Sequence, residues 1–141
     1  GLVQGKANAV APGKRMLSSM TPTFVVGPER TFIVGTPGGS RIISMVLLAS
    51  VGFMLNETPP DAWVNAPRFH HQFLPDVVQH EPGAFTPEVA AELEKRGHVL
   101  KNLGRRYGNM QAILVDRKTG RLTGISDARG EGAVVFVPAK R

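Results

Sequence analysis

The feature that most constrains the fold is an apolar segment, 42–55, that no charged residue or proline interrupts. Ser40 stands before it as a plausible N-cap, and the pattern predicts an α-helix over Arg41–Asn56. Almost no polar face remains on this helix. We therefore expect it to be buried on nearly all sides, as in a helical layer packed onto a sheet. The segment is shorter than the ~20 residues that cross a bilayer, so we expect no membrane span.

Short β-branched segments on both sides of this helix predict the sheet on which it packs. Polar turns over 27–30 and 116–121 separate the members of two pairs, which indicates two hairpins. We expect strands over 21–26, 31–34, 110–115, 122–125 and 133–137. The segment 1–19 has no clear period and is interpreted as an extended lead-in.

The middle of the chain predicts shorter elements. These are a helix that starts at Thr58–Asp61 and stops before Pro67, one bent strand or two short strands over 69–81, a helix capped by Thr86 that ends at Gly97, and a short strand over 98–100. The order shows no strict βαβ alternation. We therefore predict one α+β domain over 1–141, with a mostly antiparallel sheet and a buried helix.

The charge balance gives little support to nucleic-acid binding. The 17 basic and 11 acidic residues give a net charge of +6, but the basic residues are scattered, and one Tyr and one Trp offer little base stacking. A solvated, net-positive face is the simpler interpretation, so we expect no nucleic-acid partner.

The chain offers no pattern for a metal or a cofactor. It has no cysteine, which excludes disulfides and thiolate catalysis. His70 and His71 are adjacent, so in a strand they point to opposite faces, and His80 and His98 stand alone. No metal-ligand spacing or nucleotide-binding motif is present, and we expect no metal and no cofactor.

The dipeptide Gly38-Gly39 ends a strand-like segment and precedes the predicted helix. Two successive backbone N–H groups at such a junction can stabilise a developing oxyanion, and glycine permits positive φ and close approach. An ordinary tight turn is the alternative. The residues alone leave both interpretations open, because no nucleophile motif accompanies the glycines.

Two further polar pairs have simpler explanations. The adjacent hydroxyls of Ser18 and Ser19 could bind a carboxylate at a strand mouth, but a turn or capping pair is the default interpretation. For Asp127 and Arg129, in a Gly-rich turn after a strand, a local salt bridge or an Asx turn is the default.

Several motifs together are similar to those of the γ-glutamyltransferase (γ-glutamyl transpeptidase) family. They follow the family's order and approximate spacing across nearly the whole chain: PGKRMLSSMTPT (12–23), GTPGGSRI (35–42), NAPRFHHQFLPD (65–76), RGH (96–98), MQAILVD (110–116) and GISDARG (124–130). The resemblance covers the C-terminal part of the family's small subunit. It implies an N-terminal-nucleophile hydrolase with an αββα sandwich, of which this chain would form a part.

The resemblance also implies an activity and site residues. Members are precursors, or zymogens, that cleave themselves into large and small subunits. The new N-terminal Thr then transfers a γ-glutamyl group from glutathione or a related amide to water, an amino acid or a peptide. Ser18 and Ser19 match the serines that hold the donor's α-carboxylate, and Gly38 and Gly39 match the oxyanion-stabilising glycines. A signature interpreted as structural comprises Arg68, His70 and His71.

The sequence departs from the family pattern in three respects. It lacks the Thr-led segment that precedes this region, it lacks the large-subunit Arg for the carboxylate, and Ala128 stands where Pro is usual. We therefore expect this polypeptide to be inactive alone and to need the large subunit of the same precursor. Leftover sheet edges and apolar helix surface would favour self-association. A cephalosporin acylase-like enzyme, a poly-γ-glutamate-processing relative and a non-catalytic binding remnant are the alternatives.

The family's bacterial members are mostly periplasmic or secreted, and the resemblance implies the same location here. The segment 1–4 shows no signal-peptide pattern.

Overall fold

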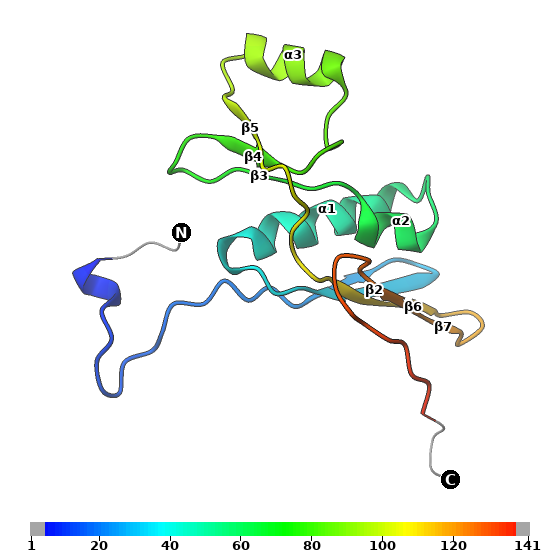
Figure 1. Ribbon diagram of the computed structural model, residues 1–141. Coiled ribbons are helices and arrows are strands. Elements are labelled where there is room, and N and C mark those ends of the chain that lie inside the picture. The colour runs from blue at the N-terminus through cyan, green and yellow to red at the C-terminus, as the bar shows by residue number, and fades with distance from the viewer. Residues whose placement is uncertain (1–4, 138–141) are drawn as a thin grey trace.

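A four-stranded antiparallel sheet forms the base of the molecule (Figure 1). The structure is a computed structural model, and it describes residues 5–137 of the 141-residue chain. The strands lie in the order β1-β2-β6-β7. Their bounds are Thr23–Val26 for β1, Arg30–Gly35 for β2, Gln111–Asp116 for β6 and Leu122–Ser126 for β7. Both predicted hairpins, β1–β2 and β6–β7, are confirmed.

The two hairpins join through β2 and β6, which are distant in sequence. Arg30 pairs with Asp116 at one end of this contact, and Gly35 pairs with Gln111 at the other. The end of β2, where the glycine-rich turn begins, is therefore fixed next to the start of β6.

The predicted long helix is α1 (Ile42–Leu55), and it lies across the sheet with the shorter α2 (Pro60–Asn65) beside it (Figure 1). Three aromatic rings join these layers: Phe32 stacks on Phe53 at 5.5 Å, and Trp63 meets both rings edge-on at 5.6 and 5.7 Å. Gly52 permits this contact, because a Cβ there would lie 2.9 Å from Trp63 Cδ1. These buried rings form the centre of the core.

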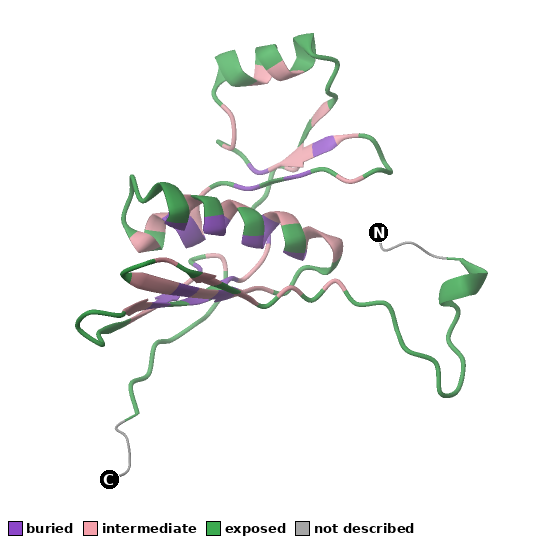
Figure 2. Ribbon diagram, turned by 180° about the vertical axis from the view of Figure 1, so that it is seen from behind, coloured by how far each residue is buried: buried purple, intermediate pink, exposed green. Residues whose placement is uncertain are grey.

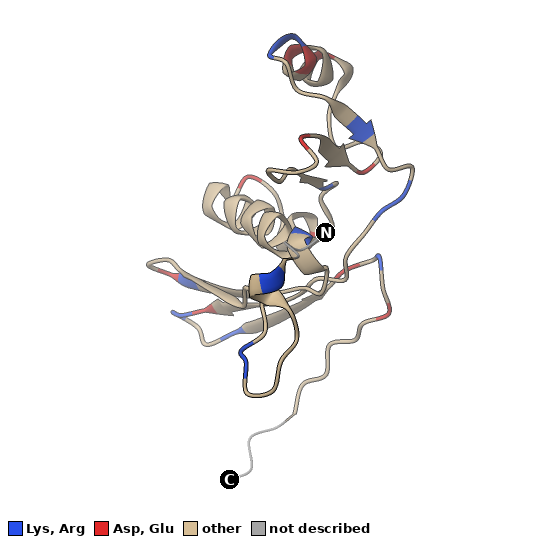
Figure 3. Cartoon of the chain, turned by 90° about the vertical axis from the view of Figure 1, so that its left-hand side faces the viewer, with Lys and Arg blue, Asp and Glu red and all other residues tan. Residues whose placement is uncertain are grey.

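The expectation that α1 is buried on nearly all sides is wrong. Ile43 and Leu47 are each 58% exposed, and Met54 and Leu55 are 61% and 62% exposed. Figure 2 shows buried residues on the side of the helix that faces the sheet and exposed residues on the other side. The sheet covers only one side of the helix, and the other described elements leave these four residues mostly exposed. The helix also has no charged residue (Figure 3).

The role of Ser40 as the N-cap is also wrong. A short 3₁₀ turn, Gly39–Arg41, precedes the helix, so that Arg41 occupies the cap position and no side chain caps it. Ser44 instead donates a hydrogen bond from its hydroxyl to the carbonyl of Arg41, at 3.0 Å. The extra turn moves the helix start two residues beyond Ser40.

A second, smaller layer lies above α1 and consists of three short strands and a helix (Figure 1). The segment 69–81 forms two strands, β3 (Phe69–His70) and β4 (Val78–His80), and β5 (Leu100–Asn102) pairs parallel to β4. The strand expected over 98–100 is thus displaced by two residues. The helix α3 (Pro87–Lys95) begins as predicted, since Thr86 Oγ1 accepts a hydrogen bond from Val89 N at 3.3 Å.

The final predicted strand, 133–137, is wrong. These residues form no strand, and Val135, Phe136 and Val137 are 78%, 66% and 83% exposed. A β-branched segment becomes a strand only where a partner supplies hydrogen bonds, and none of the described strands pairs with it. The lead-in contains only a short 3₁₀ turn, Lys6–Asn8, within its described part, and its segment 1–4 lies outside the described residues.

The sheet and its covering helices confirm the α+β class. Within residues 5–137, no helix combines the length and apolar character needed to cross a bilayer.

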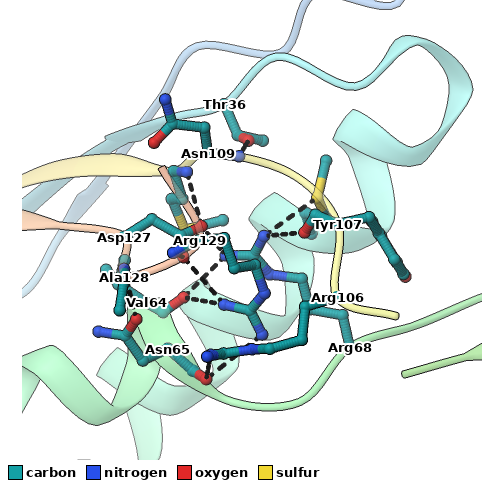
Figure 4. Close-up of polar contacts among 12 residues, drawn as sticks. Thr36, Val64, Asn65, Arg68, Arg106, Tyr107, Asn109, Asp127, Ala128 and Arg129 are labelled. Carbon is teal, nitrogen blue, oxygen red and sulfur yellow. Dashed lines mark hydrogen bonds and ion pairs between the residues drawn. The ribbon is translucent and has the colours of Figure 1, made fainter. Parts of the chain in front are cut away.

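Four buried charged side chains join the two layers, and Figure 4 shows three of them, Arg68, Asp127 and Arg129. Arg68 Nη2 lies 2.6 Å from Asp127 Oδ2, and Arg129 Nη2 lies 2.5 Å from Glu81 Oε2. Arg129 Nη1 also lies 3.0 Å from Asp127 Oδ1. All four side chains are at most 3% exposed. We call these four residues the ionic cluster.

The ionic cluster also satisfies backbone groups from four segments. Arg68 donates to the carbonyls of Val64, at the end of α2, and of Tyr107, at 2.8 and 2.6 Å. The Glu81 carboxylate accepts from the N–H of Tyr107, and that of Asp127 accepts from the N–H of Met110. The cluster therefore holds α2, the end of β4, the segment before β6 and the turn after β7 in one arrangement.

The turn after β7 has the Asx geometry expected for Asp127 and Arg129. The carboxylate of Asp127 accepts from the N–H of Arg129 at 2.9 Å, in addition to their ion pair. The N–H of Ala128 donates to Asn65 Oδ1 at 2.9 Å, a hydrogen bond that a proline at this position could not make. Ala128 thus adds a link between this turn and α2.

Two opposing effects act on the carboxyls of the cluster. Burial by itself raises the pKa of Glu81, but hydrogen bonds and attraction from Arg129, with the N–H of Tyr107, outweigh it and leave the pKa lowered. Burial also raises the pKa of Asp127, and backbone N–H donors with the two arginines reverse that effect. Both carboxyls are therefore held in their charged form.

Acid should weaken the fold through these two carboxyls. Their folded pKa values lie below the ordinary values of 4.5 for Glu81 and 3.8 for Asp127. Their contribution to stability is thus complete above the ordinary values and is lost as the pH falls through the folded ones. We expect the free energy of unfolding, measured by urea titration, to decrease as the pH falls below about 4.5.

At neutral pH, Glu81→Gln should reduce this free energy by about 3 kcal/mol or more, because it leaves two buried guanidiniums with a single carboxylate, that of Asp127. Glu92→Gln is the matched control, since Glu92 pairs with Arg96 on the exposed face of α3. It should cost no more than about 0.5 kcal/mol. Equal losses in the two variants would contradict a structural role for the ionic cluster.

The exposed apolar face of α1 should make the isolated 141-residue polypeptide self-associate, because water disfavours a continuous apolar surface of this kind. Leu47→Glu should lower the mass measured by light scattering at high concentration. Val99→Glu changes an exposed apolar residue outside α1 and serves as the control. A monomeric mass for the unmodified polypeptide at every concentration would show that this face does not drive association.

Candidate functional site

The turn between β2 and α1 needs glycine at both of its central positions. Gly38 has a φ of +153° and Gly39 a φ of +59°, a region that other residues rarely adopt. A Cβ on Gly38 would lie 2.5 Å from Met45 Cε, whereas a Cβ on Gly39 would have no atom within 4 Å. The backbone at Gly39 is therefore open to close approach by a ligand.

The amide groups of this turn are available to a ligand. Gly38 accepts a hydrogen bond on its carbonyl from the N–H of Arg41 at 3.2 Å. Among the hydrogen bonds of the described turns, none is donated by the N–H of Gly38 or Gly39. Two neighbouring N–H groups without a partner can bind an anion, including the oxyanion of a tetrahedral intermediate.

Ser18 and Ser19 lie in the extended segment before β1 and line a cavity of about 920 Å³. Ser18 Oγ accepts a hydrogen bond from Met20 N at 3.2 Å, and the carbonyl of Ser19 accepts one from Thr21 Oγ1 at 3.0 Å. The hydroxyl of Ser18 thus makes the turn contact that is the default for such a pair, and it also faces the cavity with Ser19. The lining also includes Ser40, the residue that follows Gly39.

Gly38 lines a second cavity of about 180 Å³. The two cavities share Ser40, His70 and Gln72, so they adjoin each other. The structure thus brings the glycine turn and the serine pair, which the sequence separates by a hairpin, to adjoining cavities. It does not place all four predicted residues in one cavity, and Gly39 lines neither.

His70 joins the second layer to the start of α1 at the boundary between these cavities. It is buried, its Nδ1 lies 2.9 Å from Ser44 Oγ, and its Nε2 lies 2.9 Å from Gln72 Oε1. His71 follows directly and pairs with Asp76 at 2.8 Å in an exposed position. The expectation that the two histidines point to opposite faces of a strand does not apply here, because β3 ends at His70 and both residues line the larger cavity.

Sequence reasoning missed three residues of this region: Arg41, Ser44 and Gln79. Ser44 follows Ser40 by one helical turn, a spacing that places both on one face, so that signal was present. Gln79 lies in β4, and no local pattern connects it with the glycine turn. Within the described residues, no group of three or more His, Asp or Glu side chains is arranged to hold a metal ion.

Comparison with known proteins places this chain in a family. A family model described as gamma-glutamyltranspeptidase matches residues 1–137. The glutathione hydrolase proenzyme of Escherichia coli K12 is 47% identical over 133 residues, which cover 92% of this chain and 22% of that protein. The proenzyme of the same name from Pseudomonas aeruginosa is 41% identical, over 97% of this chain and 25% of that protein. The chain thus spans about a quarter or less of these relatives.

Solved structures agree with this result. A Helicobacter pylori gamma-glutamyltranspeptidase mutant superposes with a TM-score of 0.82 at 38% identity, over 92% of this chain and 71% of that chain. The fold is therefore that of the N-terminal-nucleophile hydrolases to which these enzymes belong, with its antiparallel sheet and covering helices. On the evidence of the family model, the relatives and the shared fold, the chain belongs to the gamma-glutamyltranspeptidase family.

Proposed function

We propose that the protein cleaves the γ-glutamyl amide of glutathione or a related donor and transfers the γ-glutamyl group to water, an amino acid or a peptide. This chain supplies the oxyanion hole and the carboxylate-binding serines. A Thr outside these 141 residues, in the same precursor, supplies the nucleophile. The observation that carries the proposal is the glycine turn, whose two amides are without described partners and which adjoins the cavity of Ser18 and Ser19.

The amides of Gly38 and Gly39 act when the Thr hydroxyl attacks the amide carbonyl carbon. The C–O bond that forms pushes an electron pair onto the carbonyl oxygen, and the two N–H groups stabilise that charge. The intermediate then collapses, the C–N bond breaks, and the leaving amine takes up the proton that the Thr hydroxyl released. Removal of one such donor costs about 3 to 4 kcal/mol of transition-state stabilisation in other enzymes.

Ser18 and Ser19 hold the other end of the donor. Their hydroxyls donate to the α-carboxylate of the γ-glutamyl group in the larger cavity. Leu17, Ile43 and Leu47 supply apolar walls beside these hydrogen bonds. Both hydroxyls lie on the same cavity as Ser40, so a bound γ-glutamyl group can extend from the serines to the turn.

The partner of this chain is the remainder of its precursor, the large subunit in particular. The relatives are named proenzymes, and the chain spans only 22% of the first of them, which supports a longer precursor. The exposed face of α1 gives the large subunit an apolar surface to cover. We propose a periplasmic or secreted location, by analogy with the family.

Replacement of the serines should weaken donor binding more than turnover. In the complete processed enzyme, we expect Ser18→Ala or Ser19→Ala to raise KM for the donor about tenfold, the effect of losing a hydrogen bond to a charged group. The kcat should change little, because the carboxylate lies far from the reacting carbonyl. Steady-state hydrolysis of γ-glutamyl-p-nitroanilide measures both constants.

Ser126→Ala is the matched control, because Ser126 lies on β7 and lines neither cavity. It should leave both constants unchanged. A loss of kcat with an unchanged KM in the Ser18 and Ser19 variants would contradict a role in holding the donor's carboxylate.

The 141-residue polypeptide by itself should release no p-nitroaniline from γ-glutamyl-p-nitroanilide. An oxyanion hole lowers the barrier only for an attack that another group makes, and the proposed nucleophile lies outside this polypeptide. The complete precursor, processed under the same conditions, is the positive control. Turnover by the polypeptide alone would contradict the proposed division of roles.

A further inference from the structure

Arg41 is the one cationic side chain that lines the smaller cavity. It lies at the end of the glycine turn, directly before α1, and is half-buried. The cavity walls are otherwise uncharged and polar along one side: Ser40, His70, Gln72 and Gln79. Its volume of about 180 Å³ accommodates a carboxylate and several waters, since a water molecule takes ~30 Å³ in the liquid.

Two contacts fix the guanidinium of Arg41 in this cavity. Its Nη2 donates to Gln79 Oε1 at 2.5 Å, and its Cζ lies 4.9 Å from the centroid of the Tyr107 ring. A guanidinium has five N–H donors, and this hydrogen bond uses one of them. The remaining donors are held in a fixed plane, the geometry that binds a carboxylate through two parallel hydrogen bonds.

Arg41 has no carboxylate partner among residues 5–137. The nearby buried acids, Glu81 and Asp127, are already paired with Arg68 and Arg129. The ionic cluster holds two cations and two carboxylates and is neutral by itself. Within residues 5–137 the charge of Arg41 is therefore uncompensated, and a half-buried cation in this position favours an anion from outside this described part.

We propose that the smaller cavity is a carboxylate subsite, in which Arg41 binds the carboxylate of the molecule on the far side of the scissile amide. This inference rests on the proposed function. With the γ-glutamyl carboxylate at Ser18 and Ser19 and the reacting carbonyl at the glycine turn, the group beyond the amide nitrogen extends along the adjoining cavity. Gly38 lines that cavity, and Arg41 lies three residues further along the chain.

Two molecules bring a carboxylate to this position in turn. The first is the peptide that leaves a donor such as glutathione, which ends in a carboxylate. The second is an amino-acid or peptide acceptor, which also carries a carboxylate. Both occupy the same side of the scissile bond, before and after the acyl-enzyme forms. The shared chemistry is a single carboxylate, and two arms of one experiment distinguish its sources.

The experiment compares acids with their amides in the complete processed enzyme. In the donor arm, hydrolysis of glutathione is compared with that of glutathione with its C-terminal carboxylate converted to an amide. In the acceptor arm, γ-glutamyl-p-nitroanilide is the donor, and glycylglycine is compared with glycylglycinamide. The measured quantity is the ratio of kcat/KM for acid and amide, in which changes in the amount of active enzyme cancel.

We expect the unmodified enzyme to prefer the acid about tenfold in at least one arm, which corresponds to about 1.4 kcal/mol. Arg41→Met should reduce this ratio to within about twofold of unity, and Arg41→Lys should retain part of it, because an ammonium keeps the charge but loses the planar fork. Arg121→Met is the matched control, since Arg121 is exposed in the β6–β7 turn. It should leave the ratio unchanged.

Gln79→Met provides a second variant if Arg41→Met fails to fold or to be processed. It removes the amide that fixes the guanidinium, and we expect the acid preference to fall about threefold, as for the loss of a modest hydrogen bond. A preference that survives both variants, or its absence from the unmodified enzyme in both arms, would overturn the subsite. Failure of the proposed function is distinct: no γ-glutamyl donor of any kind would then be cleaved.

Discussion

The ionic cluster of Arg68, Glu81, Asp127 and Arg129 determines how the two layers of this chain sit on each other. Removing four charges from water is expensive, and the cost is offset only because each charge meets an opposite charge and several backbone groups. The hydrophobic core of Phe32, Phe53 and Trp63 joins the sheet to its helices, and it meets the second layer at Leu103, directly after β5. Directional polar contacts in the ionic cluster add to this contact in fixing the relative position of that layer.

The shape of the candidate site depends on how the two layers are arranged. One wall comes from the glycine turn and α1 on the sheet side, and the other comes from the residues after β3 in the second layer. The hydrogen bond between Ser44 and His70 and the one that Arg41 donates to Gln79 cross the boundary between the walls. A substitution in the ionic cluster would therefore alter the distance between the walls, although it replaces none of the residues that line the cavities.

Elements defined by local chemistry could be predicted from the sequence, and those that depend on a distant partner could not. The hairpins and the α3 cap follow from turn and capping residues within a few positions. The exposure of Leu47 and the missing strand at 133–137 depend on what covers them, which no local pattern states. No local sequence pattern predicted the buried ion pair of Glu81, because its partner Arg129 lies 48 positions away. The family resemblance predicted Gly38 and Ser18 as site residues. Arg41 became a candidate only from the charges around it in the structure.

The hydrogen bond from the Tyr107 N–H to the Glu81 carboxylate has a consequence for sequence evolution and protein engineering. It joins the two ends of segment 81–107, which carries α3 and β5. The first and last residues of this segment are therefore held next to each other. Lengthening a closed segment costs little, about 0.6 kcal/mol for each doubling. The exposed turn at Gly97 is thus a position where insertions, deletions or a fused reporter domain can be accommodated without moving the glycine turn.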